Sequence, residues 1–124
     1  MLTGILAGTS GAALGQGAIQ EPEQVARRTW VGEFGTASYY GPAYHGRLAA
    51  DGRRFDQMAL TAAHPWLPFG TKVKVTLAGT SRTVIVTITD RMHTSGRVVD
   101  LSVAAARQLG IITRGIATVS LLPV

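Results

Sequence analysis

Four aspartates are the residues of this chain whose side chains could drive acid–base chemistry. Asp51, Asp56, Asp90 and Asp100 are the only carboxylates after position 33. Cleavage of a glycosidic bond needs a proton donor with a raised pKa, and ordinary hydrolysis also needs a second carboxylate that activates water or attacks carbon. Asp90 is the best donor candidate, because the apolar run before it would place its carboxyl beside low-dielectric surface. The alternative is that Asp90 ends a strand and bonds the backbone of the next turn.

Asp100 and His64 are two further candidates. Asp100 can cap a following helix or pair with Arg97, and the structural role is favoured. His64 ends a run of small residues, where it could orient a carboxyl or hydrogen-bond a sugar, and a satisfied, partly buried histidine is the alternative. The three histidines of the chain are too widely spaced for a local metal motif, so neither a metal site nor a cofactor is predicted.

Aromatic and basic residues indicate which classes of ligand the chain favours. Aromatic side chains lie beside Gly-rich turns, where they can stack on sugar rings or simply pack in a core: Tyr39, Tyr40, Tyr44, Trp66 and Phe69. The net charge of +5 favours anionic or neutral partners, but the basic residues are scattered, which argues against nucleic-acid binding. Phosphate-cradling loops, nucleophile-elbow serines and HExxH zinc motifs are absent from the sequence.

The elements that must position these residues are mostly strands. Residues 72–77 alternate with a period of two, and residues 83–89 form a β-branched run with largely apolar residues on both faces. Residues 115–122 are also rich in β-formers, and Pro123 ends them. One short helix is predicted over 102–109, with Ser102 as N-cap and Gly110 as its stop. Several short strands around one helix predict a small closed β-barrel.

The chain divides into three parts. Residues 1–18 carry no charge and end in small residues, which is typical of an export leader or its remnant, although no Lys or Arg opens it. The alternative is a Gly-rich N-terminal tail on a cytosolic protein. Residues 19–33 are predicted to be a linker, and residues 34–124 the folded domain. The absence of cysteine excludes disulfides and a lipid anchor attached through cysteine. We therefore expect a monomer, without a membrane anchor once the leader is removed, in the periplasm or outside the cell.

An ordered set of sequence blocks resembles the RlpA (rare lipoprotein A) family, related to expansins. The blocks run in order through residues 34–122: Gly35–Gly41, Tyr44–Arg47, Ala50–Gly52, Phe55–Asp56, Leu60–His64, Leu67–Val73, Thr89–Arg91 and Gly96–Ser102. The resemblance implies a six-stranded double-psi β-barrel. It also implies an exported lytic transglycosylase that acts on peptidoglycan glycan strands, with a preference for strands without stem peptides, during cell-wall remodelling.

The same resemblance implies roles for particular residues. A lytic transglycosylase activates no water, so one carboxyl can serve as acid and then as base. Asp90 takes this role and His64 the place of the family's cleft histidine, while Ser38 and Asp100 line the same groove. The other residues implied to hold glycan are Tyr39, Tyr40, Asp51, Arg53 and Arg91. Glycan strands are the implied partner, and cell-division or wall proteins stay open as further partners.

Two departures from the family pattern leave an alternative open. Arg53 stands where the family usually has Glu, and an Arg beside Asp90 would stabilise the ionised carboxylate. The family's Asp-Arg-Gly-Pro block reads Asp-Arg-Met-His in residues 90–93. The alternative is a non-catalytic, expansin-like module that binds or loosens the wall. A third interpretation, an interaction domain for other wall proteins, has no residue-level support.

Overall fold

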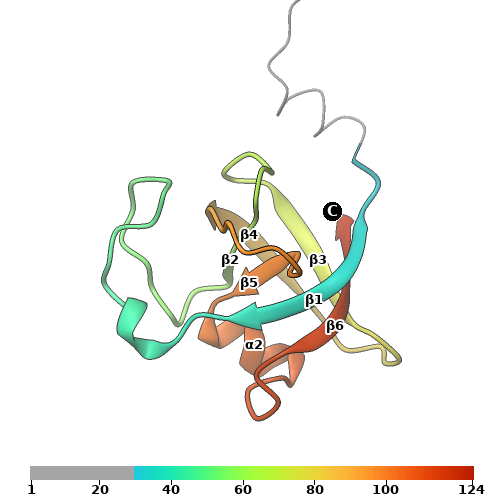
Figure 1. Cartoon of the computed structure of the whole chain (residues 1–124). Coiled ribbons are helices and arrows are strands. Elements are labelled where there is room, and N and C mark those ends of the chain that lie inside the picture. The colour runs from blue at the N-terminus through green and yellow to red at the C-terminus, as the bar shows by residue number, and fades with distance from the viewer. Residues whose placement is uncertain (1–29) are drawn as a thin grey trace, which may run out of the picture.

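A closed β-barrel is the architecture of residues 30–124, the part of the chain that the computed structural model describes (Figure 1). Its six strands are β1 (Glu33–Tyr39), β2 (Thr61–Ala63), β3 (Lys72–Leu77), β4 (Thr83–Asp90), β5 (Val99–Leu101) and β6 (Ala117–Pro123). They close in the order β1-β5-β2-β4-β3-β6, with β1–β5 and β2–β4 parallel and the other neighbours antiparallel. The predicted six-stranded, mainly β fold is confirmed.

Strands β3 and β4 form because their apolar residues alternate. Val75 pairs with Val84, and both are completely enclosed in the core. The intervening side chains point outward, and Ile85 is 46% exposed. The sequence predicted two apolar faces for residues 83–89, but the outer face of β4 is solvent-facing because the barrel encloses only one face of each strand.

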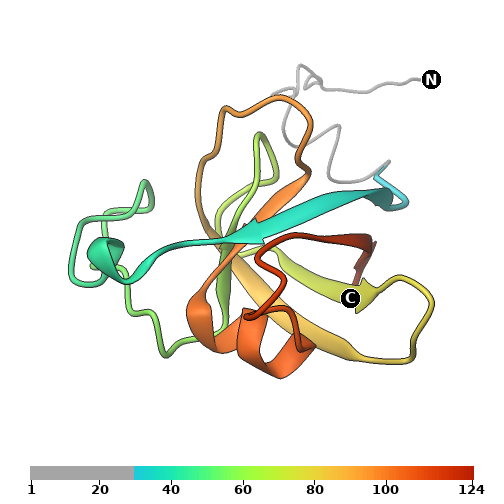
Figure 2. The ribbon, with the colours of Figure 1, turned by 60° about the horizontal axis from the view of Figure 1, so that its bottom comes forward.

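The predicted helix is confirmed as α2 (Val103–Leu109), and Figure 2 shows it packed across one end of the barrel. The Ser102 hydroxyl accepts the N–H of Ala105 at 3.2 Å, which is the expected N-cap. Gly110 ends the helix at a φ of +87°, a left-handed conformation that favours glycine. None of the helices in residues 30–124 is long and apolar enough to cross a membrane.

The folded unit begins earlier than the predicted boundary at Phe34. Strand β1 already includes Glu33, and Trp30 packs against the core. The predicted linker over 19–33 therefore extends too far. The start of β1 could not be recognised from apolar periodicity, because glycine interrupts the pattern there. The predicted leader at 1–18 and the remainder of that linker, up to residue 29, lie outside the described residues.

One long segment leaves the barrel between β1 and β2. It contains the short 3-10 helix η1 (Pro42–Tyr44), and Figures 1 and 2 both show it projecting from one side of the barrel. Near its tip, Leu48 and Arg54 form an isolated antiparallel β-bridge. This segment borders the site described next.

Candidate functional site

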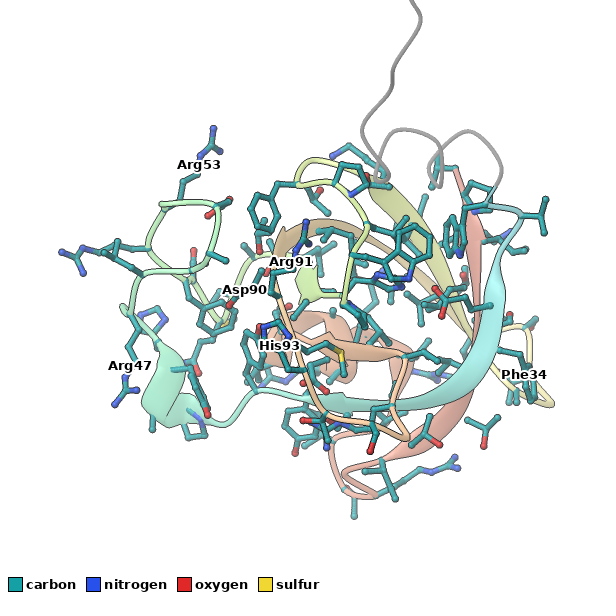
Figure 3. The ribbon with its side chains drawn as sticks, turned by 45° about the horizontal axis from the view of Figure 1, so that its top comes forward. Phe34, Arg47, Arg53, Asp90, Arg91 and His93 are labelled. Carbon is teal, nitrogen blue, oxygen red and sulfur yellow. The ribbon has the colours of Figure 1, made fainter. Side chains whose placement is uncertain are left out.

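Asp90 is the last residue of β4, and its carboxylate opens into a cavity of about 320 Å³. The strand alternation that buries Val86 and Ile88 determines where it emerges at the barrel rim. The cavity is lined by side chains from β1 and the residue after it, from η1, from the end of β4 and the loop that follows it, and from β5: Ser38, Tyr39, Tyr40, Tyr44, Asp90, Arg91, Met92, His93, Thr94, Arg97 and Asp100. Figure 3 shows Asp90, Arg91 and His93 gathered at the centre of this face.

Three donors hold the Asp90 carboxylate. Its Oδ1 accepts the backbone N–H of Arg91 at 2.8 Å and of Ala50 at 2.9 Å. Its Oδ2 accepts the phenol O–H of Tyr40 at 3.0 Å. Because each oxygen has two lone pairs, Oδ1 is fully used by these bonds and Oδ2 keeps one lone pair for a further partner. Oδ2 is therefore the atom through which Asp90 can exchange a proton in the cavity.

Asp100 is the second carboxylate of the cavity, and a cation pairs with it. The Arg97 guanidinium donates from Nε to Oδ1 at 2.9 Å and from Nη2 to Oδ2 at 3.2 Å. The Ser38 hydroxyl donates to the same Oδ1 at 2.5 Å, because the parallel register of β1 and β5 sets Ser38 beside Asp100. The predicted pairing with Arg97 is confirmed, while the helix cap that was the other possibility is Ser102. Ser38 and Asp100 thus lie together on the wall of the cavity.

Tyr39 and Tyr40 both line the cavity, but their hydroxyls differ. The Tyr39 hydroxyl donates to the carbonyl of Ile112 at 2.8 Å, which ties the end of β1 to the loop after α2. Burial, and then the negative charge of Asp90 and the hydrogen bond to it, raise the pKa of Tyr40 above its ordinary value of 10.0. The Tyr40 phenol is consequently a stable donor to Asp90 throughout the physiological pH range.

His64 does not line the cavity of Asp90. Its imidazole is completely enclosed, Nε2 lies 2.5 Å from Glu33 Oε2, and Nδ1 accepts the N–H groups of Trp66 at 3.2 Å and Leu67 at 3.1 Å. These partners place the ring proton on Nε2. Burial lowers the pKa of His64, although the bond to Glu33 acts in the opposite direction. This is the satisfied histidine that sequence reasoning kept as its alternative.

Arg91 connects the His64 loop to the cavity. Its Nη1 donates to the carbonyl of Leu67 at 2.7 Å and is 3.5 Å from that of His64, and its guanidinium lies 4.1 Å from the centre of the Phe69 ring. Arg91 directly follows Asp90 in the chain, so the loop that binds the Arg91 side chain also holds the end of β4 in place.

Asp51 and Arg53 belong to a neighbouring hollow. They line a separate cavity of about 170 Å³, and the Asp51 carboxylate accepts the N–H of Arg53 at 2.9 Å. The Arg53 side chain is exposed and points away from Asp90 (Figure 3). Asp51 does not line the first cavity; its N–H donates at 3.1 Å to the carbonyl of Thr89, the residue before Asp90. The salt bridge between Arg53 and Asp90 that would have opposed acid chemistry is not formed.

Sequence reasoning missed two residues that the structure brings into play. Glu33 was counted with the linker, yet it accepts the indole N–H of Trp30 at 3.1 Å and contacts His64. His93 was considered as a metal ligand and as part of the altered 90–93 block, but it was given no role of its own, and it lines the cavity beside Asp90. The signal for His93 was its place three residues after the strand-ending aspartate. Within residues 30–124, no group of three or more His, Asp or Glu side chains could hold a metal ion.

Comparison with known proteins identifies the family. Residues 33–121 match the family model described as lytic transglycolase, which covers the barrel except for the last two residues of β6. The chain belongs to this family. The resemblance to RlpA is thereby confirmed, because curated relatives carry that name. A probable endolytic peptidoglycan transglycosylase RlpA of Synechocystis is 56% identical over 88 residues, covering 70% of this chain and 27% of that protein.

A second relative gives the same picture. The endolytic peptidoglycan transglycosylase RlpA of Campylobacter jejuni is 45% identical over 94 residues, covering 73% of this chain and 34% of that protein. The chain thus spans only about a third of the length of these relatives.

Two solved structures share the barrel. A Streptomyces papain inhibitor superposes with a TM-score of 0.59 at 26% identity, covering 74% of this chain and 94% of the inhibitor. An expansin of Clavibacter michiganensis superposes with a TM-score of 0.58 at 25% identity, covering 75% of this chain and 50% of the expansin. These neighbours confirm the double-psi β-barrel for the described residues.

Proposed function

We propose that this chain is an exported lytic transglycosylase that cleaves peptidoglycan glycan strands at Asp90. The observation that carries the proposal is that the two carboxylates of the cavity have different hydrogen-bond and ion-pair partners. The Arg97 guanidinium binds both oxygens of Asp100 and favours its ionised form, whereas the three donors that bind Asp90 are neutral, and its Oδ2 lies in the cavity with one lone pair left for substrate. Family membership and the names of the curated relatives support the same activity.

One carboxyl is sufficient for this reaction. The protonated Asp90 transfers its proton to the glycosidic oxygen as the bond from that oxygen to the anomeric carbon of the muramoyl residue breaks. The C6 hydroxyl of the same sugar then attacks the anomeric carbon and returns its proton to Asp90, which regenerates the acid and leaves a 1,6-anhydro end. The attacking hydroxyl is already part of the substrate, so no second carboxylate is needed to activate water.

The other predicted site residues act around this step. Tyr40 and the two backbone N–H groups orient the carboxylate, and Ser38 and Asp100 form the polar wall of the cavity. His64 acts at a distance: it holds the loop that accepts Arg91, and is a positioning residue. Tyr39 forms part of the cavity wall, whereas Asp51 and Arg53 contact the parts of the glycan strand that extend beyond the cavity.

The test is chemical. Peptidoglycan treated with an amidase to remove stem peptides is digested with the whole chain and analysed by mass spectrometry for 1,6-anhydro-muramoyl ends. Asp90→Asn should lower the rate of anhydro-end formation at least about a hundredfold, the range of general acid–base catalysis. Asp56→Asn is the comparison for loss of a carboxylate: Asp56 is exposed and lies outside this cavity, in the neighbouring hollow of Asp51 and Arg53, so any effect should appear in KM and not in kcat.

The opposite outcome defines the alternative. If neither wild type nor Asp90→Asn forms anhydro ends while both still bind the glycan, the chain is a non-catalytic, expansin-like wall-binding module. If Asp90→Asn cuts as fast as wild type, another residue is the acid.

A further inference from the structure

The segment around η1 exposes an aromatic side chain that the core does not require. None of the residues of η1 is buried, and Tyr44 is 50% exposed. What distinguishes Tyr44 from other exposed aromatics is its place beside a polar cavity, where a half-exposed ring can stack on a ligand. Tyr44 also lines the same cavity as Asp90.

The Tyr44 ring is held in a row of aromatic rings that ends at Asp90. Its centroid lies 5.3 Å from that of Tyr40, with the planes inclined at 31°, and Tyr40 packs edge-to-face on the buried Phe55 at 4.8 Å. Tyr40 in turn bonds Asp90 through its hydroxyl. Because Phe55 fixes Tyr40, and Tyr40 supports Tyr44, the exposed ring has a defined place beside the carboxylate.

A cation accompanies this ring. The Arg47 guanidinium lies 5.6 Å from the centre of the Tyr44 ring, and the two residues are tied by a bond from the Arg47 N–H to the Tyr44 carbonyl at 3.1 Å. Figure 3 shows Arg47 at the outer edge of the segment that projects beside Asp90, across the molecule from Phe34. The ion pairs formed within residues 30–124 leave Arg47 without a carboxylate. Its guanidinium is therefore able to leave the ring for an anionic ligand.

We propose that Tyr44 and Arg47 form a binding subsite for a sugar next to the bond that Asp90 cleaves. Tyr44 stacks on the apolar face of a pyranose ring, and Arg47 binds the lactyl carboxylate of a muramoyl residue. That carboxylate is free only where no stem peptide is attached. The Arg47 charge therefore distinguishes peptide-free muramoyl strands from neutral chains that lack the lactyl group. The inference rests on the proposed function for its ligand, and it assigns two residues that no catalytic step requires.

Binding measurements separate the two parts of the subsite. Titration calorimetry in an Asp90→Asn background, which prevents cutting, compares peptide-free glycan strands with chitohexaose, a neutral N-acetylglucosamine chain. Tyr44→Ala should weaken binding of both ligands about tenfold, because the stacking surface is lost. Arg47→Gln should weaken binding of the peptide-free strands about fivefold to tenfold and leave that of chitohexaose unchanged.

Controls exclude trivial explanations. Phe34→Ala removes an aromatic that is 70% exposed on the other side of the molecule and should change neither affinity. Tyr44→Leu keeps an apolar contact with Tyr40 and should weaken binding as Tyr44→Ala does, which separates loss of stacking from loss of loop structure. Circular dichroism checks that each variant is folded.

Several results would overturn the subsite. It is wrong if Tyr44→Leu and Tyr44→Ala bind both ligands as the parent does, if Arg47→Gln affects both ligands equally, or if neither ligand binds to the parent. Failure of the proposed function is distinguishable: the wild-type chain would form no anhydro ends, yet the Tyr44 and Arg47 effects on affinity would persist.

Discussion

Asp90 is defined as a candidate acid by its hydrogen bonds rather than by burial. Two N–H groups fix Oδ1, and within residues 30–124 the hydrogen bond to Oδ2 comes from Tyr40. The Tyr40 hydroxyl therefore sets the direction of the lone pair that remains for substrate. This makes Tyr40 the side chain whose loss should affect the reaction most without removing a reacting group.

Tyr40→Phe should lower the rate of anhydro-end formation about tenfold. The variant keeps the ring contacts with Tyr44 and Phe55 and removes only the hydrogen bond to a charged group, which contributes about 1.5–3 kcal/mol in other proteins. Turnover and KM measured on peptide-free strands should show the loss in kcat, with KM nearly unchanged. A rise in KM at constant kcat would show instead that Tyr40 binds sugar and does not orient Asp90.

The raised pKa of Tyr40 gives this variant a second signature. The unfolded chain releases the tyrosine proton near its ordinary pKa of 10.0, while the folded chain retains it. The folded state then binds more protons than the unfolded state, so stability falls as pH rises above 10. Tyr40→Phe lacks this contribution, and its melting temperature should decline less steeply than that of wild type between pH 9 and 11.

At the scale of elements, the loop between β2 and β3 connects a buried histidine to the cavity. His64 holds the N–H groups of Trp66 and Leu67, and the Leu67 carbonyl holds Arg91. On the other side of the imidazole, Glu33 from β1 fixes the tautomer. A protonated His64 would direct an N–H toward two backbone donors, so this loop cannot keep its structure with the histidine charged.

Stability should therefore decline as the pH falls below about 6.5. Burial lowers the pKa of His64 in the folded chain, so below 6.5 the unfolded state binds a proton that the folded state does not. Glu33 and Arg91, the charged groups facing His64, partly oppose each other in this effect. His64→Gln should be less stable at pH 7 by about 2–4 kcal/mol, because buried hydrogen bonds are lost.

The measurement is the melting temperature from pH 7.5 to 5. The wild type should lose stability over this range and His64→Gln should lose less, since His45 and His93 are common to both chains. Parallel curves would mean that His64 titrates alike in the folded and unfolded chain. Anhydro-end formation by His64→Gln at a permissive temperature then reports how far the loop positions Arg91 and Asp90.

Elements with regular alternation could be predicted from the sequence, and the shortest ones could not. β3 and α2 carry a full pattern or both caps, and they match their predicted ranges closely. β2 and β5 have three residues each, too few to show a period, and they form only because the closed barrel supplies neighbours on both sides. The start of β1 at Glu33 was hidden for another reason, because glycine interrupts the apolar pattern of this longer strand.

The site follows the same division. Asp90 could be found because a strand end is visible in the sequence. The pairing of Ser38 with Asp100 was suggested only by family resemblance, because it depends on the register of two strands that lie 62 residues apart. The burial of His64 and the outward direction of Arg53 depend on tertiary packing that no local pattern encodes.

At the scale of the whole molecule, the net charge of the chain favours association with the proposed substrate. The net charge is +5, whereas a peptide-free glycan strand carries one carboxylate on each muramoyl residue. Opposite charges accelerate and strengthen association at low ionic strength, and salt screens the effect over a Debye length of about 10 Å at 0.1 M. The general attraction and the local contact made by Arg47 should therefore respond differently to salt.

Retention of the chain on peptide-free peptidoglycan should weaken severalfold between 0.05 and 0.5 M NaCl, as measured in a sedimentation assay. The double variant Lys74→Gln, Arg114→Gln lowers the charge by two at exposed positions outside the cavity, so it should bind more weakly at low salt and converge with wild type at high salt. Arg47→Gln should stay weaker than wild type at high salt, because a direct pair at the binding surface is screened less than distant charges. If both variants converge with wild type, Arg47 contributes only general attraction, and recognition of the strand depends on the aromatic row and the walls of the Asp90 cavity.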